Sequence, residues 1–403
     1  MTLVDAGDDR DLRRVLLLLT PSITLAVATE FMVIGLLPPI AAGFDVPLST
    51  AGQLTAVFAI AAAVAGPFVT LAVSRVPPAT LLTAVLVLFG VGNGVIAGSS
   101  DFTLVLVMRA LQGAFLPALI GVGTAEVLRR APAGSRGRAL ARANLGFVLG
   151  VLIALPAGIA LAQSGDWRLS FAVLGVVSLP VAVAVGILFP RNGISHHHRR
   201  AAGNLALLRR APFLGHLVVS VVIFAAMFSA YTYLGAWFEE ALGLDARGLA
   251  LALLLFGAVG VAGNVVAERV ADRFPLGATA LTAVALAAAV NVAAGTGNSI
   301  LAAAVPLAVW GLMHTAGVTL SQVRVTLAGA RAPAFAMTLN ISAANLGIAV
   351  GALTGGWAVD RFGMAGLGLM PAALTAVALL VLIPLRASPL SRQNRVDVAP
   401  VDA

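Results

Sequence analysis

The sequence contains no cysteine and no lysine, and it has few charged residues of either sign. The absence of cysteine excludes disulfides and thiolate metal sites. Charged residues make up 10% of the 403-residue chain and hydrophobic residues 60%, whereas a soluble domain has about 25% charged residues. So few charges cannot cover the surface of a soluble protein of this size. We therefore expect an integral membrane protein in contact with the lipid bilayer.

One stretch, residues 274–323, contains fifty residues without an acidic residue or an arginine, and only the polar segment 295–299 interrupts it. A transmembrane helix needs about 20 mostly apolar residues, because the hydrocarbon core is about 30 Å thick and a helix rises about 1.5 Å per residue. The stretch therefore predicts two membrane-spanning helices joined by a tight turn.

Similar apolar runs recur along the chain and predict an all-α polytopic membrane protein with twelve transmembrane helices. The first run resembles a cleavable signal peptide, but it continues past Ala28 to about Phe44, so we expect an uncleaved helix. The expected spans are 15–42, 50–74, 78–98, 102–128, 139–163, 169–190, 212–238, 247–271, 276–296, 299–327, 334–360 and 365–386.

The arginines predict the orientation of these spans. Twenty-one of the 25 lie in the two termini and in alternate loops that share one side, among them Arg324. Positive charge marks cytoplasmic loops, so we expect both termini in the cytoplasm. This distribution explains the high pI without nucleic acid, which we do not expect as a partner. The arginine-rich, lysine-free composition is typical of a GC-rich bacterial genome, so we expect the inner (plasma) membrane of a bacterium.

The longest predicted cytoplasmic loop divides the twelve spans into six and six. Its run of three histidines, residues 196–198, is expected to belong to a solvated basic linker and not to a metal site. The expected organisation is an N-terminal segment (1–14), a six-helix bundle (15–190), a basic linker (191–211), a second six-helix bundle (212–386) and a C-terminal tail (387–403).

The two halves repeat a short motif. Ala-Asn-Leu-Gly, followed three residues later by another glycine, occurs at residues 143–150 and again at 344–351, each time in the fifth span of its half. Two parallel six-helix repeats imply a pseudo-two-fold axis along the membrane normal, with a substrate site near the midplane. The paired glycines allow close helix packing. This is a transporter architecture.

Glu30 lies near the middle of the first span, next to Thr29, with no basic residue within one helical turn. A charge at the bilayer centre costs about 2.5–3.5 kcal/mol on insertion scales, so such residues usually face a cavity or a partner. Burial favours the neutral acid. Glu30 is therefore a candidate proton carrier, and the alternative is a permanently protonated packing residue.

Arg109 is the one basic residue that we expect inside a span, and Gln112 follows it by one turn. A buried guanidinium needs acceptors, which main-chain carbonyls, Gln112 or Glu30 would supply. The alternative is an arginine that extends to the outer headgroups. Thr29 and Gln112 are candidates for the first-half wall of a substrate cavity.

In the second half, polar and aromatic residues suggest the opposite wall of that cavity. His314 lies in the middle of the tenth span, on the same face as Trp310, and histidine titrates near neutral pH. Tyr231, Tyr233 and Asn345 offer neutral hydrogen-bonding groups. The alternative for all of them is a set of interhelical contacts of about 0.6 kcal/mol each.

The sequence lacks a phosphate-binding loop, a catalytic triad, a Gly-x-Ser-x-Gly motif and a metal-ligand cluster. We therefore expect neither an enzyme nor a bound metal or cofactor, and no ATP drive within this chain. A proton gradient is the expected energy source.

These motifs give the chain a resemblance to a known family. It resembles the major facilitator superfamily from about Thr20 to Leu385, and most closely the twelve-helix drug:proton antiporters typified by arabinose-efflux and chloramphenicol-resistance permeases. The resemblance is carried by Thr29-Glu30-Phe31, Arg109-x-x-Gln112-Gly113, Arg136-Gly137-Arg138-Ala139 and the glycines of the fifth span.

The resemblance implies roles for two further sets of residues. The antiporter motif of the fifth span corresponds here to Gly146, Gly150, Pro156 and Gly158, with Leu155 where the family usually has glycine. A cytoplasmic gate would include Arg75 in the first half and Asp272 and Arg273 in the second. Ser74 stands where the family's first-half aspartate is usual.

The expected function is proton-coupled export of a small organic molecule, such as a drug, an antibiotic or a sugar-like metabolite, by alternating access. Two alternatives stay open: facilitated diffusion or import of a sugar or nucleoside, and a membrane sensor that does not transport. Each chain would contain a complete pathway, so we expect a functional monomer.

Overall fold

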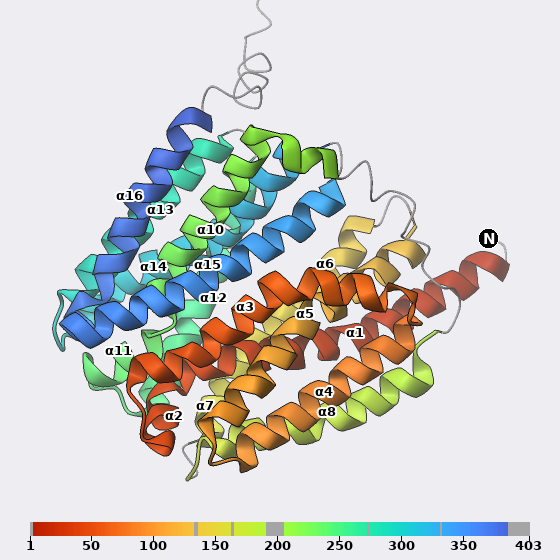
Figure 1. The fold of residues 1–403 in the computed structure, drawn as a ribbon, viewed down its shortest axis with the longest axis horizontal. Coiled ribbons are helices and arrows are strands. Elements are labelled where there is room, and N and C mark those ends of the chain that lie inside the picture. Colours follow the sequence, from red (N-terminus) through yellow and green to blue (C-terminus); the bar gives the residue numbers. More distant parts are fainter. Residues whose placement is uncertain are drawn as a thin grey trace, which may run out of the picture. The chain divides into compact units, whose positions relative to one another are not determined.

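The computed structural model describes residues 3–132, 136–162, 165–190, 205–271, 274–330 and 333–385. In these residues the chain is helical and contains no strand (Figure 1). Twelve segments of the described part are long and apolar enough to cross a membrane, as the sequence predicts. Many outward-facing side chains are large and apolar, for example Leu17, Phe68 and Leu301, as lipid contact requires.

The chain divides into two compact units. The first comprises Met1–His197 and Leu244–Leu254. Within it, α3 packs along α5, α4 along α8, and α1 along α6 (Figure 1). Its helices are α1 (Leu3–Gly35), α2 (Leu37–Phe44), α3 (Leu48–Ala72), α4 (Pro78–Gly98), α5 (Phe102–Arg130), α6 (Arg136–Leu149), α7 (Leu155–Ala162) and α8 (Arg168–Leu188).

The second unit comprises His198–Gly243 and Leu255–Ala403. Within it, α10 packs along α15 and α16, and α13 packs along α14. Its helical segments are η5 (Leu205–Arg209), α10 (Ala211–Tyr231), α11 (Leu234–Glu240), most of α12 (Ala246–Ala271), α13 (Pro275–Ala294), α14 (Ile300–Ala328), α15 (Pro333–Phe362), η6 (Met364–Gly368) and α16 (Leu369–Leu385).

The units repeat each other in their helix starts. Helices α5 and α14 both have 29 residues. Each begins after an N-cap side chain that accepts a main-chain N–H: Asp101 accepts from Thr103 at 2.8 Å, and Ser299 accepts from Ala302 at 3.2 Å. Helices α4 and α13 both start on a proline, which fits the first turn because its missing N–H has no partner there. In the described residues, these repeated helix starts agree with the predicted fold of two pseudo-symmetric six-helix bundles.

Turns interrupt the first and the seventh of the spans that the sequence predicts as continuous. The first span breaks at Leu36, between α1 and α2, because Pro38 and Pro39 lack an N–H and cannot continue the helix hydrogen bonds of α1. The seventh span breaks at Thr232 and Tyr233, where the Tyr233 N–H bonds to Ala230 O at 3.0 Å in a tighter turn before α11 begins.

Candidate functional site

Glu30 lies in α1, five residues before the helix ends at Gly35. Its side chain is 8% exposed, and its neighbour Thr29 is fully buried. Among the described residues, no hydrogen bond or ion pair within 4.0 Å involves the Glu30 carboxyl group. In the part of the chain that the structure describes, the carboxyl group is thus held in the interior without a hydrogen-bond partner.

Arg109 is fully buried in α5, which excludes the alternative of an arginine extending to the headgroups. Its guanidinium donates to three main-chain carbonyls: Leu54 O at 3.2 Å, Thr29 O at 2.8 Å and Glu30 O at 3.0 Å. It also lies 4.4 Å from the ring centroid of Phe58. Arg109 therefore fixes α5 to α1 and α3 at the level of Glu30.

The acceptors of Arg109 are main-chain carbonyls, one of the possibilities that the sequence leaves open; Gln112 is not among them. The Glu30 carboxyl interacts electrostatically with the Arg109 guanidinium but forms no ion pair within 4.0 Å. A fixed positive charge thus lies close to the carboxyl without binding it. The carboxyl oxygens therefore stay available to water or substrate.

Asn93, which was not among the site residues predicted from the sequence, connects these residues to α4. Its Nδ2 donates to Thr29 Oγ1 at 2.8 Å, and its Oδ1 accepts from Gln112 Nε2 at 3.3 Å. Gln112 Nε2 also lies 3.4 Å from Phe89 O, whereas Gln112 Oε1 is buried without a partner. The signal available in the sequence was an asparagine, a polar residue, within a mostly apolar span; in the structure this residue is fully buried.

We name the set Thr29, Glu30, Asn93, Arg109 and Gln112 the α1 polar centre. Its members come from α1, α4 and α5, all in the first unit. Polar contacts inside a bundle of apolar helices orient these helices relative to one another. Hydrogen bonds thus link the side chains of Thr29, Asn93 and Gln112, and Arg109 joins Glu30 through the main-chain oxygen of Glu30.

The glycines of the fifth span pack α6 and α7 against α1. A Cβ atom on Gly146 would collide with Thr20 O and Ile23, and one on Gly150 would collide with Val27. A Cβ atom on Gly158 would collide with Met32, two residues after Glu30. These contacts are the close packing that the sequence predicts for the glycines, and they hold the segment opposite the α1 polar centre.

The fifth span is not one continuous α-helix, contrary to the prediction for residues 139–163. A π-helical turn, Gly150–Ala154, separates α6 from α7. Pro156 is the second residue after this turn. In a regular α-helix a proline ring would clash with the carbonyl one turn earlier, and the missing N–H would leave that carbonyl without a helix bond. Such a site commonly widens the helix into a π-turn. In the second unit, α15 is continuous, with Gly347 and Gly351 packed against the α10 main chain.

In the second unit, an aromatic cluster surrounds His314. The His314 ring lies 4.4 Å from Tyr231, 5.3 Å from Phe228 and 6.2 Å from Phe256, centroid to centroid. Trp310 contacts Phe256 edge-on at 5.6 Å, which places Trp310 and His314 on the same face of α14, as expected. His314 Nδ1 and Trp310 Nε1 are buried without hydrogen-bond partners. The cluster thus offers flat apolar surfaces and polar atoms that a small organic molecule could engage.

Two other residues expected in the cavity wall are held by different contacts. Tyr233 is fully buried and donates to Ala352 O at 2.9 Å, which fixes the turn before α11 to α15. Asn345 donates to Ile341 O of its own helix at 3.0 Å, and its Oδ1 is buried without a partner. The structure therefore brings Tyr231, Trp310 and His314 together in one cluster, whereas the Tyr233 hydroxyl is hydrogen-bonded to α15.

The cytoplasmic gate stays a prediction. Arg75 ends the short 3₁₀ turn Val73–Arg75 and is exposed. Asp272 and Arg273, its expected counterparts in the second half, lie outside the described residues, as does the histidine run 196–198.

Arg324 corrects the expected distribution of arginines. The sequence places it in a cytoplasmic loop, whereas the structure places it inside α14, 1% exposed. The prediction grouped Arg324 with Arg331 in one cytoplasmic loop, although Arg324 lies within the expected span 299–327. Arg109 is therefore not the one arginine inside a span.

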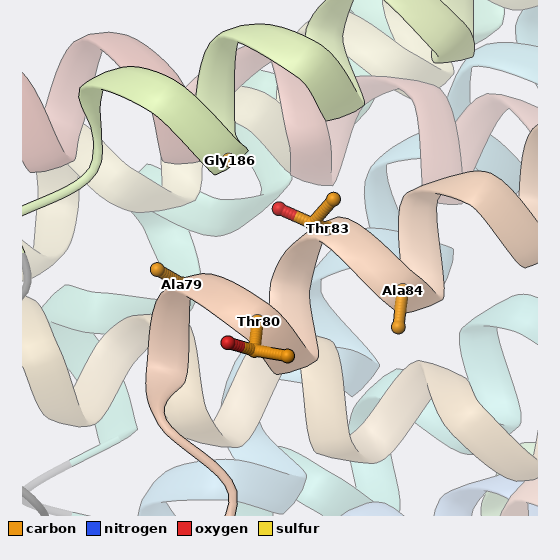
Figure 2. Close-up of a pocket in the computed structure, with 5 residues that line it drawn as sticks. All are labelled: Ala79, Thr80, Thr83, Ala84 and Gly186. Carbon is orange, nitrogen blue, oxygen red and sulfur yellow. The ribbon is translucent and has the colours of Figure 1, made fainter.

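A shallow hollow between α4 and α8 lies apart from all these residues. Small side chains line it: Ala79, Thr80, Thr83, Ala84 and Gly186 (Figure 2). It contains no charged or aromatic group and none of the candidate site residues, so we assign no ligand to it.

Comparisons with known proteins agree with this architecture. Residues 19–333 match the Major Facilitator Superfamily. The chain is 30% identical to the inner membrane transport protein YdhP of Escherichia coli (strain K12) over 361 residues, which cover 88% of this chain and 91% of YdhP. It is 27% identical to the MFS-type transporter YtbD of Bacillus subtilis (strain 168) over 340 residues, covering 83% and 86% of the two chains.

Solved structures show the same fold at lower identity. A bacterial homologue of the human lysosomal transporter Spinster, in an inward-facing and unoccupied conformation, superposes with a TM-score of 0.77 at 15% identity, covering 97% of this chain and 99% of that chain. The human organic anion transporter MFSD10 gives a TM-score of 0.66 at 16% identity, covering 92% and 99%. With its twelve apolar helices in two repeated bundles, the chain belongs to the Major Facilitator Superfamily and is a multi-pass membrane transporter of that type.

Proposed function

We propose that this transporter exports a small organic molecule across a bacterial inner membrane in exchange for protons. The observation that carries the proposal is the Glu30 carboxyl group, which is buried in the first unit next to the fixed Arg109 guanidinium and has no bonded partner of its own among the described residues. An acid in this position can be loaded with a proton from one side and release it to the other as the bundles move.

The α1 polar centre supports the coupling step. Protonation of Glu30 removes the attraction between its carboxylate and Arg109, while Arg109 stays bonded to carbonyls of α1 and α3. The change in the interaction energy between Glu30 and Arg109 is thus transmitted to α1, against which the glycines of α6 and α7 pack closely. Substrate contacts in the second unit would come from Tyr231, Trp310 and His314.

The proton gradient supplies enough energy for export. One proton that moves inward across about 100 mV releases about 2.3 kcal/mol. This corresponds to a concentration ratio of roughly fifty-fold for a neutral solute, since each 1.36 kcal/mol is a factor of ten. No further cofactor is needed, and one chain would contain the complete pathway. We also propose that both termini lie in the cytoplasm.

Everted membrane vesicles test the direction and the coupling. A susceptibility screen that includes chloramphenicol, and an efflux screen with arabinose, would first select a transported compound. Vesicles with an acidified lumen should then accumulate it, and Glu30→Gln should abolish accumulation while the protein still inserts. The control is Glu240→Gln, which neutralises an exposed glutamate. Uphill accumulation by Glu30→Gln would refute the role of Glu30, whereas pH-independent equilibration by wild type would indicate a facilitator of a sugar or nucleoside.

A further inference from the structure

The second unit contains a buried polar network that the proposed function does not use. It connects His216 and Ser220 of α10, Ser321 and Arg324 of α14, and Asn340 of α15, all of which are at most 2% exposed. These helices lie together within the second unit (Figure 1). We name these five residues the Arg324 network.

The hydrogen bonds of the network surround Arg324 with neutral acceptors. Arg324 Nη1 donates to His216 O at 2.6 Å and lies 3.2 Å from His216 Nδ1, and Nη2 donates to Ser220 Oγ at 2.8 Å. Ser220 Oγ in turn donates to Asn340 Oδ1 at 2.7 Å, and Ser321 Oγ donates to the same oxygen at 3.0 Å. Every partner of the guanidinium is thus uncharged.

Arg324 lacks the negative charge that accompanies other buried arginines in this chain. Arg130 pairs with the Glu126 carboxylate one turn earlier, and Arg109 has Glu30 nearby. Among the described residues, no carboxylate lies within ion-pair distance of Arg324. A guanidinium remains protonated in proteins, so burial without a counter-charge is costly.

Two N–H donors of the network also remain unused. A guanidinium has no acceptor, so His216 Nδ1 must accept from Arg324, and the imidazole proton is then on Nε2. His216 Nε2 and Arg324 Nε are both buried and both lack a partner in the structure. A buried cation with two unsatisfied N–H donors has the chemistry of an anion-binding site.

The network lies near one end of the second bundle. Arg324 precedes the last residue of α14, Ala328, by four residues, or about 6 Å at about 1.5 Å per residue. An apolar cluster at the same helix ends, formed by Leu207, Phe213, Val325 and Ala336, packs beside it. Arg324 therefore lies about one helical turn from the end of α14, next to apolar residues of the same bundle end.

We propose that the Arg324 network binds one small monovalent anion, either a halide from the medium or the carboxylate of a bound compound. The anion would supply the missing counter-charge and accept the unused N–H groups of Arg324 and His216. The inference goes beyond the proposed function, because anion binding here needs neither Glu30 nor a proton gradient.

Equilibrium dialysis of the full-length protein in neutral detergent, with radiolabelled chloride and with gluconate as the balancing anion, tests the proposal. Wild type should retain about one chloride per chain, and a parallel dialysis with labelled benzoate tests the carboxylate. Displacement of chloride by benzoate would show one site for both anions; binding of only one of them would identify the halide or the carboxylate as the ligand. Saturable binding of neither anion would overturn the proposal.

Matched variants assign the site. Arg324→Gln should abolish binding, and His216→Phe should weaken it at least tenfold while keeping the main-chain acceptor of residue 216. Arg210→Gln, which removes an exposed arginine at the start of α10, should bind as wild type does. Glu30→Gln should also bind normally, which separates this proposal from proton coupling. If Arg324→Gln does not fold, His216→Phe alone is compared with wild type. Anion binding equal to that of wild type, in either variant that folds, would overturn the assignment of the site to the Arg324 network.

Discussion

Replacement of Arg109 by methionine tests how strongly this residue holds the α1 polar centre together. The change removes three hydrogen bonds to carbonyls of α1 and α3 and the contact with the Phe58 ring. Interhelical hydrogen bonds in membrane proteins average about 0.6 kcal/mol each, and a desolvated cation–π contact contributes about 2 kcal/mol. We therefore expect Arg109→Met to lower the free energy of unfolding by about 4 kcal/mol.

The same substitution measures the coupling between Arg109 and Glu30. In a double-mutant cycle, Arg109→Met should destabilise the Glu30→Gln background less than it destabilises wild type, by about 1–3 kcal/mol. The sign follows from the charges: the guanidinium attracts the carboxylate and not the protonated acid. The coupling should therefore be present at high pH and disappear as the pH falls and Glu30 takes up its proton.

Unfolding in mixed micelles of SDS and a neutral detergent, followed by tryptophan fluorescence, gives these free energies. Arg361→Met, which removes an exposed arginine, is the control and should change the stability by less than about 0.5 kcal/mol. Additive effects of the two substitutions at every pH would show that Glu30 and Arg109 do not interact. A loss of less than about 1 kcal/mol in Arg109→Met would refute the stabilising role of its carbonyl contacts.

Two further predictions concern helix packing. Gly113→Val should prevent folding or destabilise the protein by more than about 3 kcal/mol, because a Cβ atom at residue 113 would overlap the carbonyl of Phe58 in α3. The control is Gly121→Ala on the same helix, where a Cβ atom meets no atom within 4 Å and should be tolerated. Thermal unfolding of the two variants measures the difference. Tyr233→Phe removes the bond to Ala352 O and should cost about 0.6 kcal/mol while transport in vesicles continues; loss of transport at unchanged stability would instead place Tyr233 in the substrate pathway.

The sequence predicted the twelve spans because each requires only a long apolar run. It indicated Glu30 and Arg109 as candidate site residues inside these spans because charges are rare in such runs. It offered main-chain carbonyls among the possible acceptors of Arg109, but it did not predict which ones, since the carbonyls of α1 and α3 carry no side-chain signal. The partners of Arg324 were equally hidden, because His216 and Ser220 lie 108 and 104 residues away in the sequence. The π-turn before Pro156 also escaped prediction, because the apolar pattern continues through it.

The central claim is that the Glu30 carboxyl group exchanges a proton with water. Infrared difference spectroscopy of the reconstituted protein, recorded between acidic and alkaline pH in H₂O and D₂O, observes the C=O stretch of protonated carboxyl groups directly. We expect a band that appears as the pH falls, shifts in D₂O and is missing from Glu30→Gln but present in Glu240→Gln. A wild-type spectrum without a titrating, D₂O-sensitive band that depends on Glu30 would contradict the proposed coupling.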